Sequence, residues 1–132
     1  MSPDAKSPPG PGGPTRQPDL AGRARVVLDM LSGLEPELRA AAVLTGDREV
    51  LASTLDDDAW RQSVVDLAES LEGIGDGDLD SSHIATEEAE VFTVRESGFS
   101  LVAVTERFVL ASLTSFDIRM SLRDLARETH DA

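Results

Sequence analysis

The hydrophobic residues of this chain change their spacing along the sequence, and the order of these changes constrains the fold more than any other feature. Apolar side chains recur every three or four residues at 20–34, 57–74 and 116–129, which is the spacing of amphipathic helices. At 38–55 and 84–105 they alternate, or run together in short stretches, as in β-strands. The sequence therefore predicts the order α-β-β-α-β-β-β-α, an α+β fold with one antiparallel five-stranded sheet and helices on both faces.

The helix predicted at 57–74 gives the clearest periodic signal. It follows three consecutive aspartates, Asp56 to Asp58, and carboxylates suit a helix N-terminus because they face its free N–H groups and its dipole. Its apolar stripe comprises Trp60, Val64, Leu67, Leu71 and Ile74. Glycines at 73, 75 and 77 are expected to end this helix in a loop.

The two terminal helices are predicted from similar stripes. The first is expected to begin at the N-cap Asp19, with Pro18 outside it, and to end near Gly33 and Pro36. Its stripe comprises Leu20, Ala24, Val27, Leu28, Leu31 and Leu34, and that of the last helix comprises Ile118, Leu122, Leu125 and Ala126. Trp60 and Phe116 are assigned to the core, with an interface role as the alternative. Residues 108–113 fit a strand or a first helical turn, so the start of the last helix stays open.

Charge and composition exclude several classes of function. The chain has 132 residues, 12 basic and 25 acidic side chains and a formal charge of −13, and residues 56–90 hold 12 acids against the single base Arg61. Nucleic acids and anionic membranes are therefore excluded as partners, because both need clustered Lys and Arg. The absence of cysteine excludes thiol catalysis and thiolate metal sites, and the sequence has no nucleophile-elbow Gly-x-Ser-x-Gly motif. The sequence predicts a protein that is not an enzyme and needs no cofactor.

The N-terminal residues differ in composition from the rest. Six of the seven prolines lie within the first 18 residues. We expect residues 1–18 to form a disordered tail and residues 19–132 to form one domain. The chain shows neither a secretory signal nor the roughly 20 consecutive apolar residues of a membrane span, so we expect a cytoplasmic location.

Three groups of polar residues are candidates for binding. Asp76, Asp78, Asp80 and Glu87 occupy positions 1, 3, 5 and 12 of an EF-hand-like calcium loop, but Ser81 stands where that loop needs glycine. Arg119, Arg123 and Arg127 form a row on the last helix that is a candidate for partner docking or simply a solvated face. His83 is interpreted as a surface histidine beside the acidic loop.

The order of elements resembles that of the roadblock/dynein light chain family, which has a profilin-like fold. AAVLTGDREVLAST, at 41–54, is similar to the first hairpin of that family. HIATEEAEVFTVRESGFSLVAVTE, at 83–106, is similar to its run of three strands. The resemblance implies a non-catalytic regulatory or scaffolding protein that docks on a small Ras-like GTPase or another NTPase.

The resemblance also implies a homodimer formed by the second helix and the following strand, here about 57–73 and 82–88. The interface residues expected on these elements are Trp60, Val64, Val65, Ala68, Leu71 and Ile84. Two alternatives remain: a profilin-like sensor of a small ligand, and a calcium-responsive module that uses the acidic loop at 76–87.

Overall fold

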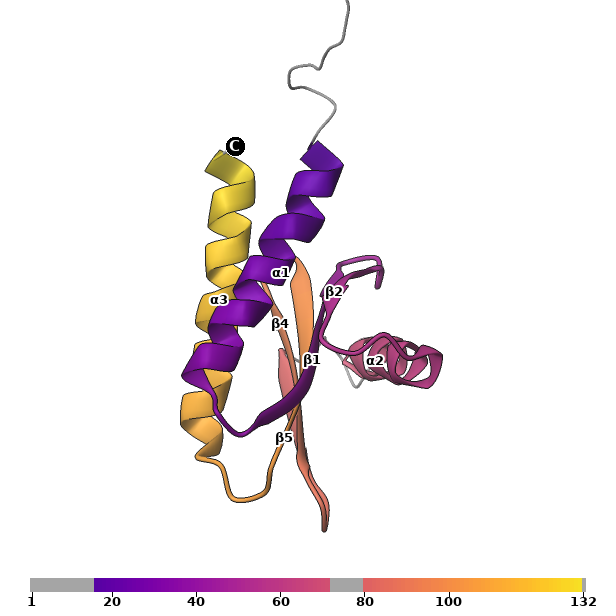
Figure 1. Ribbon diagram of the computed structural model, residues 1–132, viewed down its shortest axis with the longest axis vertical. Coiled ribbons are helices and arrows are strands. Elements are labelled where there is room, and N and C mark those ends of the chain that lie inside the picture. Colours follow the sequence, from indigo (N-terminus) through magenta and orange to yellow (C-terminus); the bar gives the residue numbers. More distant parts are fainter. Residues whose placement is uncertain (1–15, 72–79, 132) are drawn as a thin grey trace, which may run out of the picture.

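The computed structural model describes residues 16–71 and 80–131 and shows three helices and five strands (Figure 1). In chain order these are α1 (Arg16–Leu34), β1 (Leu38–Thr45), β2 (Val50–Ser53), α2 (Asp58–Ser70), β3 (Ser81–Ala85), β4 (Glu90–Glu96), β5 (Phe99–Thr105) and α3 (Ala111–Asp131). This order confirms the prediction of an α+β fold.

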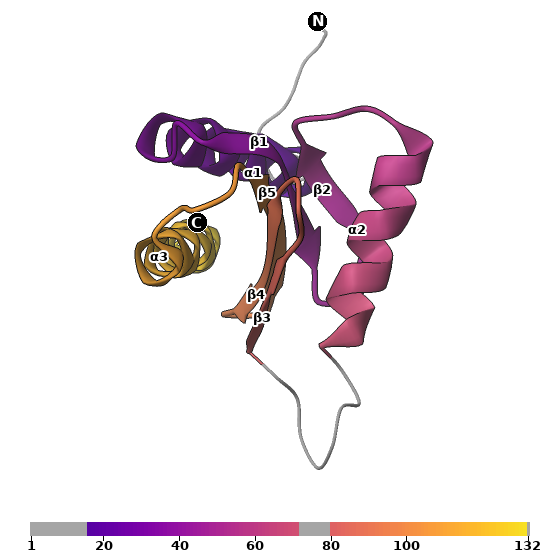
Figure 2. The ribbon, with the colours of Figure 1, turned by 90° about the horizontal axis from the view of Figure 1, so that it is seen from below.

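The strands form one antiparallel sheet in the order β2-β1-β5-β4-β3. The neighbouring strands β1 and β5 are distant in sequence, and β2 and β3 form the two edges of the sheet. Figure 2 shows α1 and α3 side by side on one face of the sheet and α2 on the other. The predicted placement of helices on both faces is therefore confirmed.

The larger core lies between the sheet and the helix pair α1 and α3. Alternation along the strands directs one set of side chains to this face. It includes Phe92 and Val94 of β4 and Leu101 and Ala103 of β5, all fully buried. The helices contribute the buried side chains Ala24, Val27, Leu28, Leu31, Ile118, Leu122 and Leu125. Most of the two apolar stripes predicted from the sequence thus lie in this core.

The smaller core lies beneath α2. Its buried members are Ala42, Leu44, Val64, Ala68 and Val102. The Asp57 side chain caps α2 by accepting a hydrogen bond from the Trp60 amide at 3.2 Å, as the run of aspartates predicts. Trp60 is half-buried, and its Nε1 donates to Ser53 Oγ at 2.7 Å, which ties α2 to β2.

Three features of the helices differ from the prediction. The first helix begins at Arg16, so Pro18 lies inside its first turn, where a missing N–H costs no helical hydrogen bond. Leu34, assigned to the buried stripe, is exposed. The assignment of Phe116 to the core is wrong, because its side chain is 58% exposed. The last helix begins at Ala111, after a turn in which Phe108 has φ 67°.

The hairpin expected at 41–54 is confirmed, and strands β2 and β3 are shorter than expected. The β1–β2 pairing shifts register between Val43 and Leu44, and Arg48 adopts φ 66° in the turn, so β2 begins only at Val50. The strand expected at 82–88 ends at Ala85. It ends there because the Thr86 hydroxyl accepts hydrogen bonds from the amides of Glu88 and Ala89, which turns the chain into β4.

Candidate functional site: the β3 edge and helix α2

Strand β3 forms an exposed edge of the sheet. It pairs with β4 on one side, from Ser81 opposite Val94 to Ala85 opposite Glu90. Among the described residues no strand pairs with its other side. His83, Ile84 and Ala85 are exposed. An edge of this kind presents unpaired N–H and C=O groups that can pair with another strand.

Ile84 extends the apolar surface beneath α2 to this edge. Ile84 pairs with Val91, and the two side chains therefore lie on the same face of the sheet. Val91 packs against the core under α2, whereas the side chain of Ile84 is 47% exposed. Helix α2 contacts β5 and β4 (Figure 2). The apolar face of the sheet thus continues beyond Val91 to an exposed isoleucine.

His83 attaches the edge strand to the rest of the protein. Its ring stacks on Phe92 with the centroids 4.4 Å apart, and its Nε2 lies 2.6 Å from Glu90 Oε1. The other oxygen of Glu90 accepts a hydrogen bond from the Phe108 amide at 2.5 Å. The hydrogen bond from His83, followed by that from Phe108, lowers the pKa of Glu90 below its ordinary value, although burial opposes this. The network connects β3 to the turn that precedes α3.

The predicted interface residues divide into two groups. Val64, Ala68 and Leu71 are almost fully buried within the protomer, so the structure uses them in its own core. Trp60 and Val65 are half-buried along α2, and Ile84 is exposed at the edge. The surface that remains available for a partner therefore comprises β3 and the outer side of α2.

The arginine row of the last helix is occupied by ion pairs. Arg119 Nη1 and Arg123 Nε each lie 3.0 Å from a separate oxygen of Glu96, at the end of β4. These contacts lower the pKa of Glu96, with the hydrogen bond from Arg123 as the largest cause. Arg127 pairs with Asp124. Arg119 and Arg123 therefore connect α3 to the sheet at Glu96, whereas Arg127 pairs within α3.

The calcium alternative falls largely outside the described residues, because Asp76 and Asp78 are not among them. Asp80 and Glu87 are exposed, before β3 and in the β3–β4 turn respectively. Within residues 16–71 and 80–131, no group of three or more potential ligands is placed to hold a metal ion. The calcium hypothesis stays a prediction.

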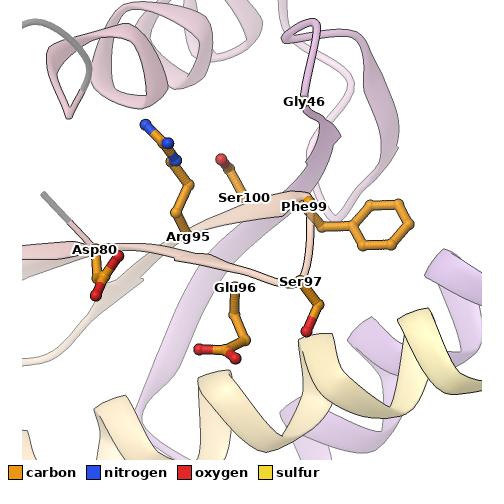
Figure 3. A pocket seen from close by; sticks show the side chains of 8 residues that line it. Gly46, Asp80, Arg95, Glu96, Ser97, Phe99 and Ser100 are labelled. Atoms are coloured by element: carbon orange, nitrogen blue, oxygen red, sulfur yellow. The ribbon is translucent and has the colours of Figure 1, made fainter. Parts of the chain in front are cut away.

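A polar hollow of about 340 Å³ lies at the tip of the β4–β5 hairpin. Its lining includes Asp80, Arg95, Ser97 and Ser100. Figure 3 shows the Arg95 and Ser100 side chains on one side of the hairpin, whereas Glu96 points to the other side, toward α3. For the small-ligand alternative, this hollow offers hydrogen-bonding groups and a cation, which suit a polar molecule.

The sequence reasoning missed the contacts that position His83, Glu90 and Glu96. Glu90, Phe92 and Glu96 alternate along one strand, and that parity places them on one face once β4 is recognised. The parity does not reveal that His83 pairs opposite Phe92, nor that α3 lies beside Glu96. Both facts depend on strand order and helix placement.

No protein-family model and no curated protein matches the sequence. Among solved structures, Myxococcus xanthus MglB matches with a TM-score of 0.69 at 12% identity, over 84% of this chain and 90% of MglB. The Roadblock/LC7 domain from Streptomyces avermitilis matches with a TM-score of 0.66 at 18% identity, over 79% of this chain and 95% of that domain. The chain has the roadblock fold. Acanthamoeba castellanii profilin IA is also similar, with a TM-score of 0.54 at 19% identity over 79% of this chain and 97% of profilin.

These matches confirm, at the level of fold, the resemblance that the sequence suggests. The matched parts cover nearly the whole of each roadblock structure, so the likeness extends to a complete domain. Among the described residues, no helix has the length and apolar character needed to span a membrane.

Proposed function

We propose that this protein is a non-catalytic regulatory or scaffolding subunit that acts as a homodimer. The exposed β3 edge carries this proposal, because it combines unpaired backbone groups with an apolar side chain, Ile84. A second copy related by a two-fold axis would pair with these backbone groups and cover the Ile84 side chain in the same contact. Such a contact is isologous, so each copy presents the same residues to the other.

In the proposed dimer the two β3 strands pair antiparallel and join the two sheets into one. The Ile84 side chains then lie on the α2 face of the joined sheet, where the two α2 helices flank the seam. The half-buried Trp60 and Val65 border this surface. Burial of each exposed isoleucine contributes roughly 1–2 kcal/mol to association, in addition to the backbone hydrogen bonds.

The resemblance to roadblock proteins supports a small Ras-like GTPase, or another NTPase, as the partner of this dimer. Exposed carboxylates on and before α2 give the docking surface its charge, and they include Asp56, Asp57, Asp58, Asp66 and Glu69. A partner for this surface presents a basic face, which increases its rate of association at low salt. The dimer acts by holding its partner's mobile loops, and this mode of action requires no catalytic side chain of its own.

The dimer is tested by measuring the mass of wild type and Ile84→Asp by sedimentation. Sedimentation is measured at high salt, which screens the repulsion between the acidic α2 helices. Each substituted copy places a carboxylate at the seam, so we expect the wild type to sediment as a dimer and Ile84→Asp as a folded monomer. Leu55→Asp is the matched control, because Leu55 is 44% exposed and lies between α2 and the opposite edge strand, β2. A wild-type monomer, or loss of the dimer in both variants, contradicts the proposed seam.

The partner is tested by affinity capture from the native lysate with GDP or a non-hydrolysable GTP analogue. We expect the wild type to retain a Ras-like GTPase in a nucleotide-dependent manner and Ile84→Asp to retain less of it. Recovery of no NTPase under either condition overturns the GTPase part of the proposal and leaves the dimer intact.

A further inference from the structure

Helix α1 exposes an apolar row beside its buried stripe. Val26, Met30 and Leu34 follow one another at intervals of four residues and are 53%, 62% and 60% exposed. At this spacing the three side chains lie above one another on the helix surface. The row is separate from the buried stripe of α1, which includes Val27 and Leu31.

Helix α3 continues this apolar surface. It runs beside α1 in the opposite direction (Figure 1). Its exposed Leu113 lines a hollow together with Leu34, and its half-buried Met120 lines another together with Val26 and Met30. A hollow of about 120 Å³ between the helices is lined by Val26, Met30, Leu34, Met120, Asp117 and Asp124, among others. Single exposed apolar residues need no explanation, but a contiguous group across two helices marks an interaction surface.

The charges on α1 are arranged so that the helix is complementary to itself when reversed. Arg23 and Arg25 lie in its first half, whereas Asp29 and the exposed Glu37 lie in and just after its second half. A two-fold axis at Met30 places Val26 opposite Leu34 of another copy. The same axis places Arg23 of one copy opposite Glu37 of the other, and the two copies of Asp29 lie about 3 Å apart along the helices.

From this arrangement we infer that the α1/α3 surface binds a second copy of this chain, with the two α1 helices antiparallel and Met30 at the axis. Two helix pairs then stack and bury their exposed rows as in a helical bundle. The contact does not depend on the proposed β3 seam, which lies at the edge of the sheet. If both contacts form, dimers join into larger assemblies.

The distribution of charge favours this surface for self-association. The acidic block at 56–90 has twelve acids and one base, whereas α1 and α3 together contain six basic and six acidic residues and carry no net charge. Screening by salt weakens attraction between opposite charges and relieves repulsion between like charges. Association through α1 and α3 is therefore expected to weaken as salt increases, and pairing beside the acidic α2 helices to strengthen.

Cross-linking tests the contact directly, because the chain contains no cysteine. Single cysteines are introduced in the Ile84→Asp background, which removes the β3 seam, and are treated with a short bismaleimide. We expect Met30→Cys to form a cross-linked dimer at low salt and several-fold less at high salt. Ser32→Cys is the control, because Ser32 is exposed on a different side of α1.

The register is tested by mixing Val26→Cys with Leu34→Cys. An axis at Met30 separates the two copies of residue 26 by about 12 Å along the helices, since each residue rises about 1.5 Å. We therefore expect the mixture to cross-link more than either variant alone. Equal yields for Met30→Cys and Ser32→Cys overturn the inference, whatever the state of the β3 seam. A mixture no better than its components overturns the axis at Met30.

Discussion

The two faces of the sheet are covered to different extents. On one face, α1 and α3 together bury a large core around Phe92 and Leu101. On the other, α2 alone buries a smaller core around Leu44 and Val102, and Ile84 at the edge stays exposed. The first face therefore closes its core within one chain. The second leaves apolar surface and an unpaired strand together, which is where a second copy would complete it.

Substitution of two matched leucines tests this difference, and it is expected to change the free energy of unfolding more than any other variant proposed below. Leu101 of β5 faces the large core and Leu44 of β1 faces the small one, and both are fully buried. We expect Leu101→Ala to lower the free energy of unfolding by about 3–4 kcal/mol and Leu44→Ala by about 2–3 kcal/mol, because the smaller core collapses more readily around a cavity. Urea unfolding of each variant below its dimer concentration checks this. A larger loss of stability for Leu44→Ala than for Leu101→Ala would contradict the expected difference between the two cores.

The closed face also contains a buried acid. Burial and the neighbouring carboxyl of Asp117 raise the pKa of Glu35 from 4.5 to about 7, and Glu37 contributes in the same direction. The hydroxyl of Thr114 donates to Glu35 at 3.1 Å and opposes this shift. Because the folded state binds this proton more tightly than the unfolded state, the stability contributed by Glu35 is complete below about pH 4.5 and is lost as the pH rises through 7.

Glu35→Gln removes this pH dependence while keeping an oxygen to accept from Thr114. We expect the variant to be more stable than wild type by about 1–2 kcal/mol at pH 8, where wild type carries a buried charge, and equal to it near pH 4. Thermal unfolding across this range is the measurement. A variant that is less stable than wild type at pH 8 contradicts the assignment of Glu35 as a destabilising buried carboxylate.

A smaller effect is expected where α3 is fastened to the sheet. Glu96 pairs with Arg119 and Arg123, and its lowered pKa means that it stabilises the fold above the unfolded pKa and that this stability is lost as the pH falls. We expect Glu96→Gln to cost about 1 kcal/mol at pH 7 and less in acid. Glu106→Gln, at an exposed carboxylate after β5, is the control and should cost less than half as much. Equal losses for the two variants would show that the paired arginines contribute nothing specific.

Most of the fold was predictable because local patterns determine the type of each element. The change from helical to alternating spacing distinguished the three helices from the two stretches of strands, 38–55 and 84–105. The start of α1 was missed because a proline in the first turn is as acceptable as one outside it. Phe116 was misplaced because helical spacing shows which residues share a face, but not how far the neighbouring helix extends over that face.

The candidate site was predictable only in outline. The resemblance indicated the second helix and the third strand, and the structure places Ile84 on the exposed edge. The sequence could not show that Val64 and Ala68 are buried in the core of the protomer, because an amphipathic stripe can face either a core or an interface. The pairing of His83 with Glu90, and of Glu96 with α3, depends on contacts between elements that no single segment encodes.

The most direct test of the central claim is hydrogen exchange along β3 as the protein is diluted. If a second copy pairs with this edge, the outward-pointing amides of residues 81–85 exchange slowly in the dimer, and exchange accelerates on dilution and in Ile84→Asp. The other edge strand, β2, should respond to neither change. Fast exchange of these β3 amides at every concentration, and equally in wild type and Ile84→Asp, would contradict a dimer built on this strand.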